Sequence, residues 1–402
     1  MTFKFVGAKY PYLMMMALAP ASDIDEVIAN RFEIAKEFAA IDGVDYDDIR
    51  IVATHDGIWH CDDLAGVVAW RPLSPTRQSP SSSLLPIVVV RTRDIRVMEK
   101  CDVRVDVGGR YDPTAGDFDH HWARPEELAR PNGVPYASAG LVWKAIGTDR
   151  CAFAGRGEKI ANIVDDKIIQ AIDAHDVRYT AMHSQDPYAA DATPRYGFSE
   201  FIASLNDNSS GQLKGDLPGF LVACHLAGVA IDQVMLQECR KALAEDIVEG
   251  AINGTTRTGI MTLGTFIPWV DALLANPAGN DVKLVIFEDQ TSGTFRLQTV
   301  PQKHGSKTPR CPLPQAWWGK DAATITEECA RRGHVIAADD VIFCHQTGFI
   351  AGAKSWDAAM AMAKAALAAA EEEEIASRMV TEAEELKTLA ADEAAGVAAK
   401  KS

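Results

Sequence analysis

The apolar residues between positions 50 and 176 follow two alternating periods along the chain. Short runs rich in Val and Ile, such as residues 87–90, have the length and composition of strands buried on both faces of a sheet. The segments between these runs repeat apolar residues every three or four positions, which is typical of amphipathic helices. Strands are predicted at residues 50–54, 86–91 and 103–107, and helices at 64–70, 138–146 and 158–176. This order predicts an α/β fold with a mainly parallel sheet flanked by helices.

The two ends of the chain show other patterns. Apolar residues recur at helical spacing over residues 22–43, so we predict an N-terminal helix before the first strand. Asp, Asn, Ser, Gly and Pro accumulate at residues 187–218, which indicates a boundary, and a long helical pattern follows at 220–250. Strands at 259–263, 283–287, 295–300 and 341–344, closed by a helix at 355–370, predict a smaller C-terminal α+β domain.

The chain carries a net charge of −16. Residues 371–402 hold nine acidic and four basic side chains, so −11 remains on the rest of the chain. An acidic protein is not expected to have an extended duplex-binding surface, because such a surface needs basic side chains. A small anionic substrate held by bound cations is still compatible with this charge, since divalent ions dominate the local field.

Apolar stretches and cysteines indicate the compartment. No run reaches the roughly 20 consecutive apolar residues of a membrane span, so we expect no membrane association. Residues 12–20, which follow Lys4 and Lys9, only faintly resemble a signal peptide. The eight cysteines form no CxxC pair, which indicates reduced thiols and a cytoplasmic protein. An oligomer is compatible with the sequence.

Five of the ten histidines lie between residues 55 and 175, each within a few residues of an aspartate. His55, His60 and Asp62 follow a predicted strand, where an α/β sheet places its ligands. The alternative for this cluster is an Asp-rich turn with a helix-capping aspartate. Asp106 lies at the end of the strand predicted at 103–107, and two glycines follow that strand. A single aspartate in such a place is more often a helix cap or a turn former.

Two further clusters complete the set. The triplet of Asp119, His120 and His121 has little use in a core, because each buried polar group needs a partner. Asp173 and Asp176 lie three residues apart on a predicted helix and share a face, and only one of them need bind a metal. Imidazole and carboxylate together suit Mn²⁺, Fe²⁺ or Zn²⁺. Two such cations provide a nucleophile and a sink for charge in phosphate-ester hydrolysis, so the residues predict a metal-dependent phosphoesterase.

At these residues the sequence resembles the DHH phosphoesterase superfamily, and more closely the melanocyte-proliferating-gene family, over about residues 50–370. The motifs agree in order and spacing. They are Thr54-His55-x-Gly57-x-x-His60-x-Asp62, Val105-Asp106-Val107-Gly108-Gly109-x-Tyr111-Asp112-Pro113, Asp119-His120-His121, Ser138-Ala139-Gly140-Leu141-Val142, Ile172-Asp173-Ala174-x-Asp176, Leu313-Pro314-x-x-Trp317 and His345-x-x-Gly348-Phe349-Ile350-x-Gly352.

The resemblance implies a DHH domain that holds two divalent metal ions, often Mn²⁺, with Mg²⁺, Fe²⁺ and Zn²⁺ as alternatives. It places metal ligands at His55, His60, Asp62, Asp106, His120 and one of Asp173 and Asp176. It places His121 against the substrate phosphate, where an imidazole could also donate a proton to the leaving oxygen, with Asp119 beside it in the catalytic group. Three neighbours of these residues depart from the family pattern, namely Asp63, Trp122 and His175, which leaves metal binding intact but puts substrate choice in doubt.

A C-terminal domain is implied to add substrate contacts. The candidates are His345, Gly348, Gly352 and Lys354. His345 follows a predicted strand, and backbone amides of a turn at 348–352 before the next helix could hold a phosphate. The alternative is a glycine-rich turn that only packs.

The leading hypothesis is a 3′–5′ exonuclease that acts on RNA or short oligonucleotides. A small-molecule phosphoesterase or pyrophosphatase is the second, favoured by the scarcity of basic residues, and a non-enzymatic metal-binding protein is the third. The predicted organisation is an N-terminal extension at 1–45, a DHH-type catalytic domain at 46–190, a boundary loop and connecting helix at 191–255, a substrate-contact domain at 256–370 and an Ala/Glu-rich tail at 371–402.

Overall fold

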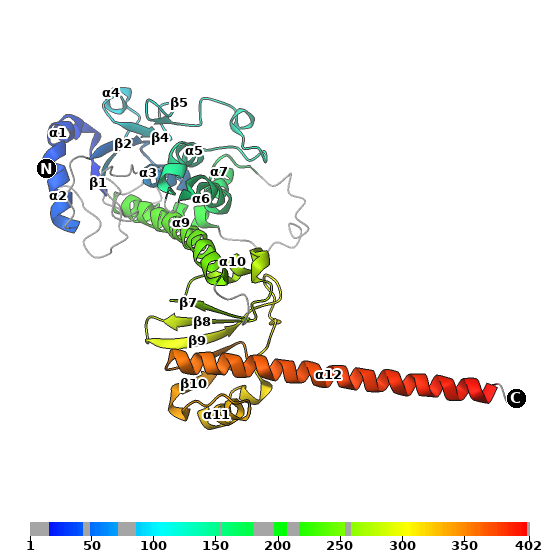
Figure 1. Ribbon diagram of the computed structural model, residues 1–402. Helices are drawn as coiled ribbons and strands as arrows, with labels where there is room; N and C mark the ends of the chain where they lie inside the picture. The colour runs from blue at the N-terminus through cyan, green and yellow to red at the C-terminus, as the bar shows by residue number, and fades with distance from the viewer. Residues whose placement is uncertain are drawn as a thin grey trace. The chain divides into compact units, whose positions relative to one another are not determined.

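The computed structural model describes residues 16–42, 49–70, 86–152, 155–179, 197–206, 217–253 and 259–399. The chain forms two compact units, Met1–Ala242 and Leu243–Ser402. Each unit is a sheet flanked by helices, so the predicted mixed α/β class is confirmed (Figure 1). The predicted boundary region at 187–218 lies largely outside the described residues, and the finer domain boundaries stay predictions.

The first unit is built on a six-stranded sheet in the order β1-β3-β2-β4-β6-β5. Its members are β1 (Met16–Ala19), β2 (Arg50–Thr54), β3 (Ile87–Arg91), β4 (Val103–Val105), β5 (Tyr111–Asp112) and β6 (Asp117–Phe118). Every pairing is parallel except that of β5 with β6. Parallel strands put their carboxyl ends at the same edge, and this edge positions the site described below.

Both faces of this sheet are buried because successive strand residues point to opposite sides. Val52 and Val89 face a core formed with α3 (Cys61–Ala69), α5 (Ser138–Arg150), α6 (Gly157–Val164) and α9 (Leu217–Asn253). Ile51 and Val88 face a second core formed with α1 (Ile24–Ala29), α2 (Arg31–Asp42) and α4 (Ile95–Met98). This double burial explains why the strands are continuous apolar runs rather than alternating ones.

The segment before β2 belongs to this sheet. The predicted N-terminal helix is present as α1 and α2, which are separated at Asn30. The prediction missed β1, which pairs in parallel with β3 and buries residues in both cores. All four residues of β1 are buried, so they show no alternation of apolar and polar positions. The sequence pattern therefore cannot distinguish this strand from the apolar part of a leader peptide.

The helix predicted at 158–176 is one continuous run of α6, a π-helical turn (Asp165–Ile169) and α7 (Gln170–Asp176). Such turns are rare and often lie at functional sites. The short helix α8 (Phe198–Ala203) follows.

The second unit has a five-stranded sheet in the order β10-β11-β9-β8-β7. The strands are β7 (Ile260–Leu263), β8 (Leu284–Asp289), β9 (Thr294–Thr299), β10 (Val341–Cys344) and β11 (Ile350–Ala353), and only the β7–β8 pair is parallel. One face packs on α11 (Ala322–Arg331) and α12 (Trp356–Ala399), and the other on α10 (Trp269–Ala275) and the end of α9.

Two predictions for the second unit need correction. The turn expected at 348–352 is wrong for its second half, because residues from Ile350 onward form β11 between two paired strands. Helix α12 continues without a break across the boundary predicted at residue 370. The side chains of residues 371–385 are exposed, as expected where few large apolar residues are available to pack.

Helix α9 carries an apolar stretch that a search for consecutive apolar residues overlooks. Gly219–Asn253 is long and apolar enough to cross a membrane by length and composition, and 44% of an apolar 18-residue stretch within it is buried in the structure. A core helix of a globular protein passes the same test, and Phe220, Cys224 and Ile231 pack into the core of the first unit. The absence of membrane association stays a prediction.

Candidate metal centre

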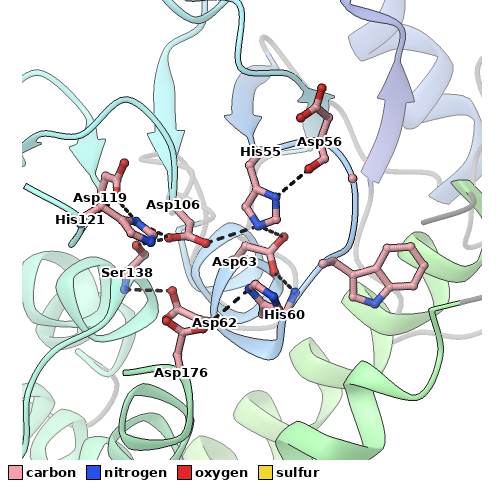
Figure 2. Close-up of polar contacts among 12 residues, drawn as sticks. His55, Asp56, His60, Asp62, Asp63, Asp106, Asp119, His121, Ser138 and Asp176 are labelled. Atoms are coloured by element: carbon pink, nitrogen blue, oxygen red, sulfur yellow. Dashed lines mark hydrogen bonds and ion pairs between the residues drawn. The ribbon is translucent and has the colours of Figure 1, made fainter. Parts of the chain in front are cut away.

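All but one of the predicted site residues of the first unit meet at the carboxyl edge of its sheet. Figure 2 shows the side chains of His55, His60, Asp62, Asp106, His121 and Asp176 pointing toward one another. His55 directly follows β2, Asp106 directly follows β4, and His120 comes two residues after β6. These three strands are parallel neighbours in the sheet, so their ends converge. His60 is the N-cap of α3, and Asp62 lies in the first turn of that helix.

Asp106 lies at the centre of this group. Its Oδ2 is 3.4 Å from His55 Nε2, and its Oδ1 is 3.5 Å from Nδ1 of both His120 and His121. Its backbone φ of +55° is in the left-handed region, which residues other than glycine rarely adopt. Surrounding structure must hold such a conformation, and residues of this kind concentrate at functional sites.

Asp62, His120 and Asp176 form a second group beside it. His120 Nε2 is 3.4 Å from Asp176 Oδ2, and His120 Nδ1 is 3.9 Å from Asp62 Oδ2. Asp62 accepts the backbone N–H groups of Ser138 at 3.0 Å and Ala139 at 2.7 Å. These donors lie at the N-terminus of α5, where unpaired N–H groups and the helix dipole favour an anion.

The described residues contain three sets of potential ligands, and within each set the ligand atoms lie within 4.8 Å of one another. The sets are Asp106 with Asp119, His120 and His121; His55 with His60 and Asp106; and Asp62 with His120 and Asp176. Asp106 and His120 each belong to two sets, so the sets overlap. Imidazole and carboxylate donors in this combination fit Mn²⁺, Fe²⁺ or Zn²⁺.

The electrostatics of the buried acids also fit bound cations. Burial, with repulsion from Asp176, raises the pKa of Asp106 to about 7. Burial likewise holds the pKa of Asp62 and of Asp63 well above the usual range. Carboxylates kept together out of water are costly unless a positive charge compensates them. Divalent cations would supply that charge and favour the ionised forms.

His121 and Asp119 form a hydrogen-bonded pair at the rim of the group. Asp119 Oδ1 accepts from the ring Nδ1 of His121 at 2.7 Å, and its Oδ2 accepts from the N–H of Gly109 at 2.6 Å. The hydrogen bond from Asp119 raises the pKa of His121 to about 9, so this ring is cationic at neutral pH. Burial opposes the shift in Asp119, but hydrogen bonds from His121 and Gly109 lower its pKa. The side chain of His121 is 63% exposed and can meet an anionic substrate.

Asp173 lies apart from the other predicted ligands. Its Oδ2 accepts from Arg130 Nη2 at 2.6 Å, and its Oδ1 accepts from the N–H of Gly140 at 2.9 Å. Arg130 also binds Asp165 in the π-helical turn. Asp173 therefore ties α7 to the start of α5, and Asp176, which lies three residues further along α7, reaches His120. Of the two acids, the geometry brings Asp176 and not Asp173 to the site.

Two residues inside the group were not predicted from the sequence as site residues. Ser138 Oγ lies 3.0 Å from both Asp106 Oδ1 and His120 Nδ1. Asp63 is fully buried, and its Oδ2 makes no hydrogen bond within the described residues and lies 3.4 Å from His55 Nε2. The signal that could have found Ser138 is its place in the Ser138-Ala139-Gly140 motif.

The loop between β2 and α3 is held by residues far away in the sequence. Arg91 at the end of β3 donates to the carbonyl oxygen of Gly57 at 2.6 Å. The side-chain amide of Asn206 donates to the carbonyl of Trp59 at 3.0 Å and accepts its N–H at 3.2 Å. These contacts fix the segment that carries His55 and His60. No local sequence motif predicts the contacts.

The second unit contains the four predicted substrate contacts. His345 and Lys354 are exposed, whereas Gly348 and Gly352 are buried. The N–H of Gly348 donates to the carbonyl of His345 at 2.9 Å, and Gly352 lies inside the sheet, so these amides already have places in the fold. A Cβ on Gly348 would lie 2.0 Å from Trp318 Nε1, which explains the glycine by packing.

Known proteins resemble this chain over most of its length. The family model MYG1_exonuc, described as "Uncharacterised protein family (UPF0160)", matches residues 51–367. The MYG1 protein of Dictyostelium discoideum is 28% identical over 335 residues, which cover 78% of this chain and 94% of that protein. The MYG1 exonuclease of Homo sapiens is 27% identical over 345 residues, which cover 79% of this chain and 85% of that protein. No solved structure matches the chain. The chain therefore belongs to this MYG1 family, the melanocyte-proliferating-gene family whose motifs it carries.

Proposed function

We propose that the protein is a metal-dependent phosphodiester hydrolase, a 3′–5′ exonuclease that acts on RNA or short oligonucleotides. The observation that carries the proposal is the convergence of two ligand sets, His55 with His60 and Asp106, and Asp62 with His120 and Asp176, at one edge of the sheet. The name MYG1 exonuclease, borne by relatives from Homo sapiens and Bos taurus, supports a nuclease-type hydrolase. On the same grounds we assign the first unit to the DHH phosphoesterase superfamily.

The proposed cofactor is a pair of divalent cations, with Mn²⁺ as the first candidate. His55, His60 and Asp106 would hold one cation, and Asp62, His120 and Asp176 the other. When bound, two such cations lower the pKa of an attacking water and neutralise charge that develops on the phosphoryl oxygens.

The protein's own residues complete the chemistry. In a cut at the 3′ end of RNA, the leaving group is the O3′ of the preceding nucleotide, which needs a proton as it departs. His121 is exposed and cationic at neutral pH, so it can bind the phosphate and donate that proton. Asp119 orients the ring through its Nδ1 hydrogen bond and stabilises the imidazolium. His345 and Lys354 of the second unit are proposed as further substrate contacts.

The charge of the chain favours a second candidate. A net charge of −16 repels long polyanions, so a small-molecule phosphoesterase or pyrophosphatase would also suit this site. Both candidates use the same cations and the same proton donor. They differ in the length of substrate that is turned over.

The test is a substrate panel with a 5′-labelled single-stranded RNA, dinucleotides and pyrophosphate, each with Mn²⁺. The proposal expects the RNA to shorten from its 3′ end with release of nucleoside 5′-monophosphates. His120→Ala should abolish this activity, whereas His334→Ala, which removes a histidine of the second unit, should keep it.

The other outcomes are distinct. Turnover of pyrophosphate or dinucleotides without turnover of the RNA would favour the second candidate. Shortening from the 5′ end would contradict the direction. Stoichiometric metal binding without hydrolysis of any phosphoester would instead indicate a non-enzymatic metal-binding protein.

A further inference from the structure

Ser138, the first residue of α5, contacts three predicted metal ligands at once. Its backbone N–H donates to Asp62 Oδ2 at 3.0 Å. Its hydroxyl lies 3.0 Å from Asp106 Oδ1 and 3.0 Å from His120 Nδ1. The side chain is fully buried, so water does not compete for these bonds. A single serine thus contacts Asp106 of one ligand set and both Asp62 and His120 of another.

The direction of the two hydroxyl bonds follows from what each partner can do. A serine hydroxyl has one proton to donate and lone pairs that accept. The ionised carboxylate of Asp106, the form that a bound cation favours, can only accept, so the hydroxyl proton goes to Asp106. The bond to His120 must then run the other way, with Nδ1–H as the donor to Ser138 Oγ.

The remaining surroundings of His120 agree with this tautomer. The two other charged atoms near Nδ1 are acceptors as well, Asp106 Oδ1 at 3.5 Å and Asp62 Oδ2 at 3.9 Å. With the proton on Nδ1, the lone pair of the neutral ring is on Nε2. Nε2 lies 3.4 Å from Asp176 Oδ2, which is also an electron-pair donor. Two electron-pair donors that face each other at this distance fit a cation bound by both.

The same reasoning separates the three candidate sets of ligand atoms. Nδ1 of His121 is hydrogen-bonded to Asp119 Oδ1, and Nδ1 of His120 is hydrogen-bonded to Ser138. In the set of Asp106, Asp119, His120 and His121, the ring nitrogens closest to Asp106 therefore both carry protons. Two sets remain available for cations, and they are the two assigned above.

We propose that Ser138 is a positioning residue that fixes the Nδ1–H tautomer of His120 and so directs Nε2 to the cation shared with Asp62 and Asp176. This inference rests on the proposed metal centre and deepens it. Ser138 itself donates no electron pair to a cation. It acts through His120 and Asp106, as hydrogen-bond partners of metal-binding histidines commonly do.

Three variants test the proposal in the full chain. Ser138→Ala removes the hydroxyl, and Ser138→Thr keeps a hydroxyl at the same position. Ser199→Ala removes another buried serine of the first unit and serves as the matched control. Thermal unfolding in EDTA checks that each variant folds without metal.

Two readouts report on the proposed role. Calorimetric titration of the metal-free proteins with Mn²⁺ should show that Ser138→Ala weakens one of two sites by about 10–100-fold, the range found when a hydrogen-bond partner of a metal-binding histidine is removed. Ser138→Thr should recover most of that affinity, and Ser199→Ala should match the wild type. In ¹⁵N-histidine spectra of the metal-free protein at alkaline pH, where Asp106 is ionised, His120 should be the Nδ1–H tautomer in the wild type and a mixture in Ser138→Ala.

The outcomes separate this inference from the proposed function. If Ser138→Ala binds Mn²⁺ as tightly as the wild type, or if wild-type His120 carries its proton on Nε2, the inference is overturned while the hydrolase proposal stands. If the wild type binds no divalent cation, both are overturned together.

Discussion

His121 is an exposed imidazole held by a carboxylate that is almost completely buried. The buried partner cannot move toward solvent, so it fixes both the orientation and the charge of the ring. His55 is held in a comparable way, with its Nδ1 2.9 Å from the carbonyl oxygen of Asp56. Burial lowers the pKa of His55 to about 4, which keeps this ring neutral and able to bind a metal. His121 is thus held as a cation that can meet substrate, whereas His55 is held as a neutral ring that can bind a metal.

Replacing Asp119 by Asn should move the alkaline limb of the pH–rate profile to lower pH. In the wild type, the hydrogen bond from Asp119 raises the pKa of His121 to about 9. The protonated donor is therefore present below that value and disappears as the pH rises through it. Without the negative charge, His121 gives up its proton at a lower pH. The measurement is kcat/KM against pH with saturating Mn²⁺.

The matched control for this change is Asp56→Asn, which removes an exposed carboxylate beside the same site. Its alkaline limb should coincide with that of the wild type. An alkaline limb that stays in place in Asp119→Asn would argue that another group protonates the leaving oxygen.

His345→Ala should raise KM for RNA by about tenfold, because a hydrogen bond to a charged group is worth about 1.5–3 kcal/mol. Mn²⁺ affinity should not change, since His345 belongs to the second unit. Steady-state kinetics and Mn²⁺ titration of the same variant check both statements. An unchanged KM would remove His345 from the proposed substrate contacts.

At the scale of elements, the site depends on how α5 and α7 are joined. Arg130, from the loop before α5, forms buried ion pairs with Asp165 and Asp173 on the helix that ends at Asp176. Gly140 in α5 donates its N–H to the same Asp173. This junction sets the distance between the Asp62-binding end of α5 and the carboxylate of Asp176.

Gly140→Ala should therefore destabilise the first unit by about 3–5 kcal/mol, the range for a broken buried ion pair. Its Cβ would lie 1.9 Å from Asp173 Oδ2 and 2.8 Å from Arg130 Nη2. Urea unfolding measures the change. Gly250→Ala is the matched control, because a Cβ there meets no atom within 4 Å and helix propensity favours alanine by about 1 kcal/mol. Equal effects of the two substitutions would show that the junction tolerates the extra atom.

The elements differ in how far the sequence predicts them. Strands β2, β3 and β4 are apolar runs bounded by polar turns, so their pattern is enough to place them. Strand β11 contains Gly352 and follows a turn, and its strand conformation comes from pairing with β10 and β9, which local sequence does not encode.

The site shows the same limit. The spacing of Asp173 and Asp176 puts both on one helical face, so it cannot separate them. The residue that decides is Arg130, which comes 43 positions before Asp173 in the chain. The strand-end ligands were predictable because parallel strands deliver their carboxyl ends to one edge, whereas contacts such as that of Asn206 with Trp59 exist only in the folded chain.

At the scale of the whole molecule, the charge distribution bears on substrate length. The site contains several aspartates, and the last part of α12 adds further negative charge. The proposed nuclease would have to rely on its proposed cations rather than on a basic surface to attract RNA. Short single strands and chain ends would therefore suit the proposed activity better than long duplexes.

Deletion of residues 371–402 removes five net negative charges and should lower KM for RNA at low salt. The difference should fade at high salt, where screening shortens the range of the repulsion. The free energy of unfolding should change by about 1 kcal/mol or less, since Glu372 is half exposed and Arg332 keeps its ion pair with Glu328 when the pair with Glu372 is lost. Kinetics at two salt concentrations and urea unfolding test this. A KM that does not respond to the deletion would mean that the tail does not repel substrate.

The most direct test of the central claim is a Mn²⁺ titration of metal-stripped protein in which bound metal and nucleotide release from RNA are measured together. The claim predicts no release without metal, full activity as two cations bind per chain, and loss of activity together with one cation in His120→Ala. Hydrolysis that survives complete metal removal, or a His120→Ala protein that retains the wild-type rate, would contradict it.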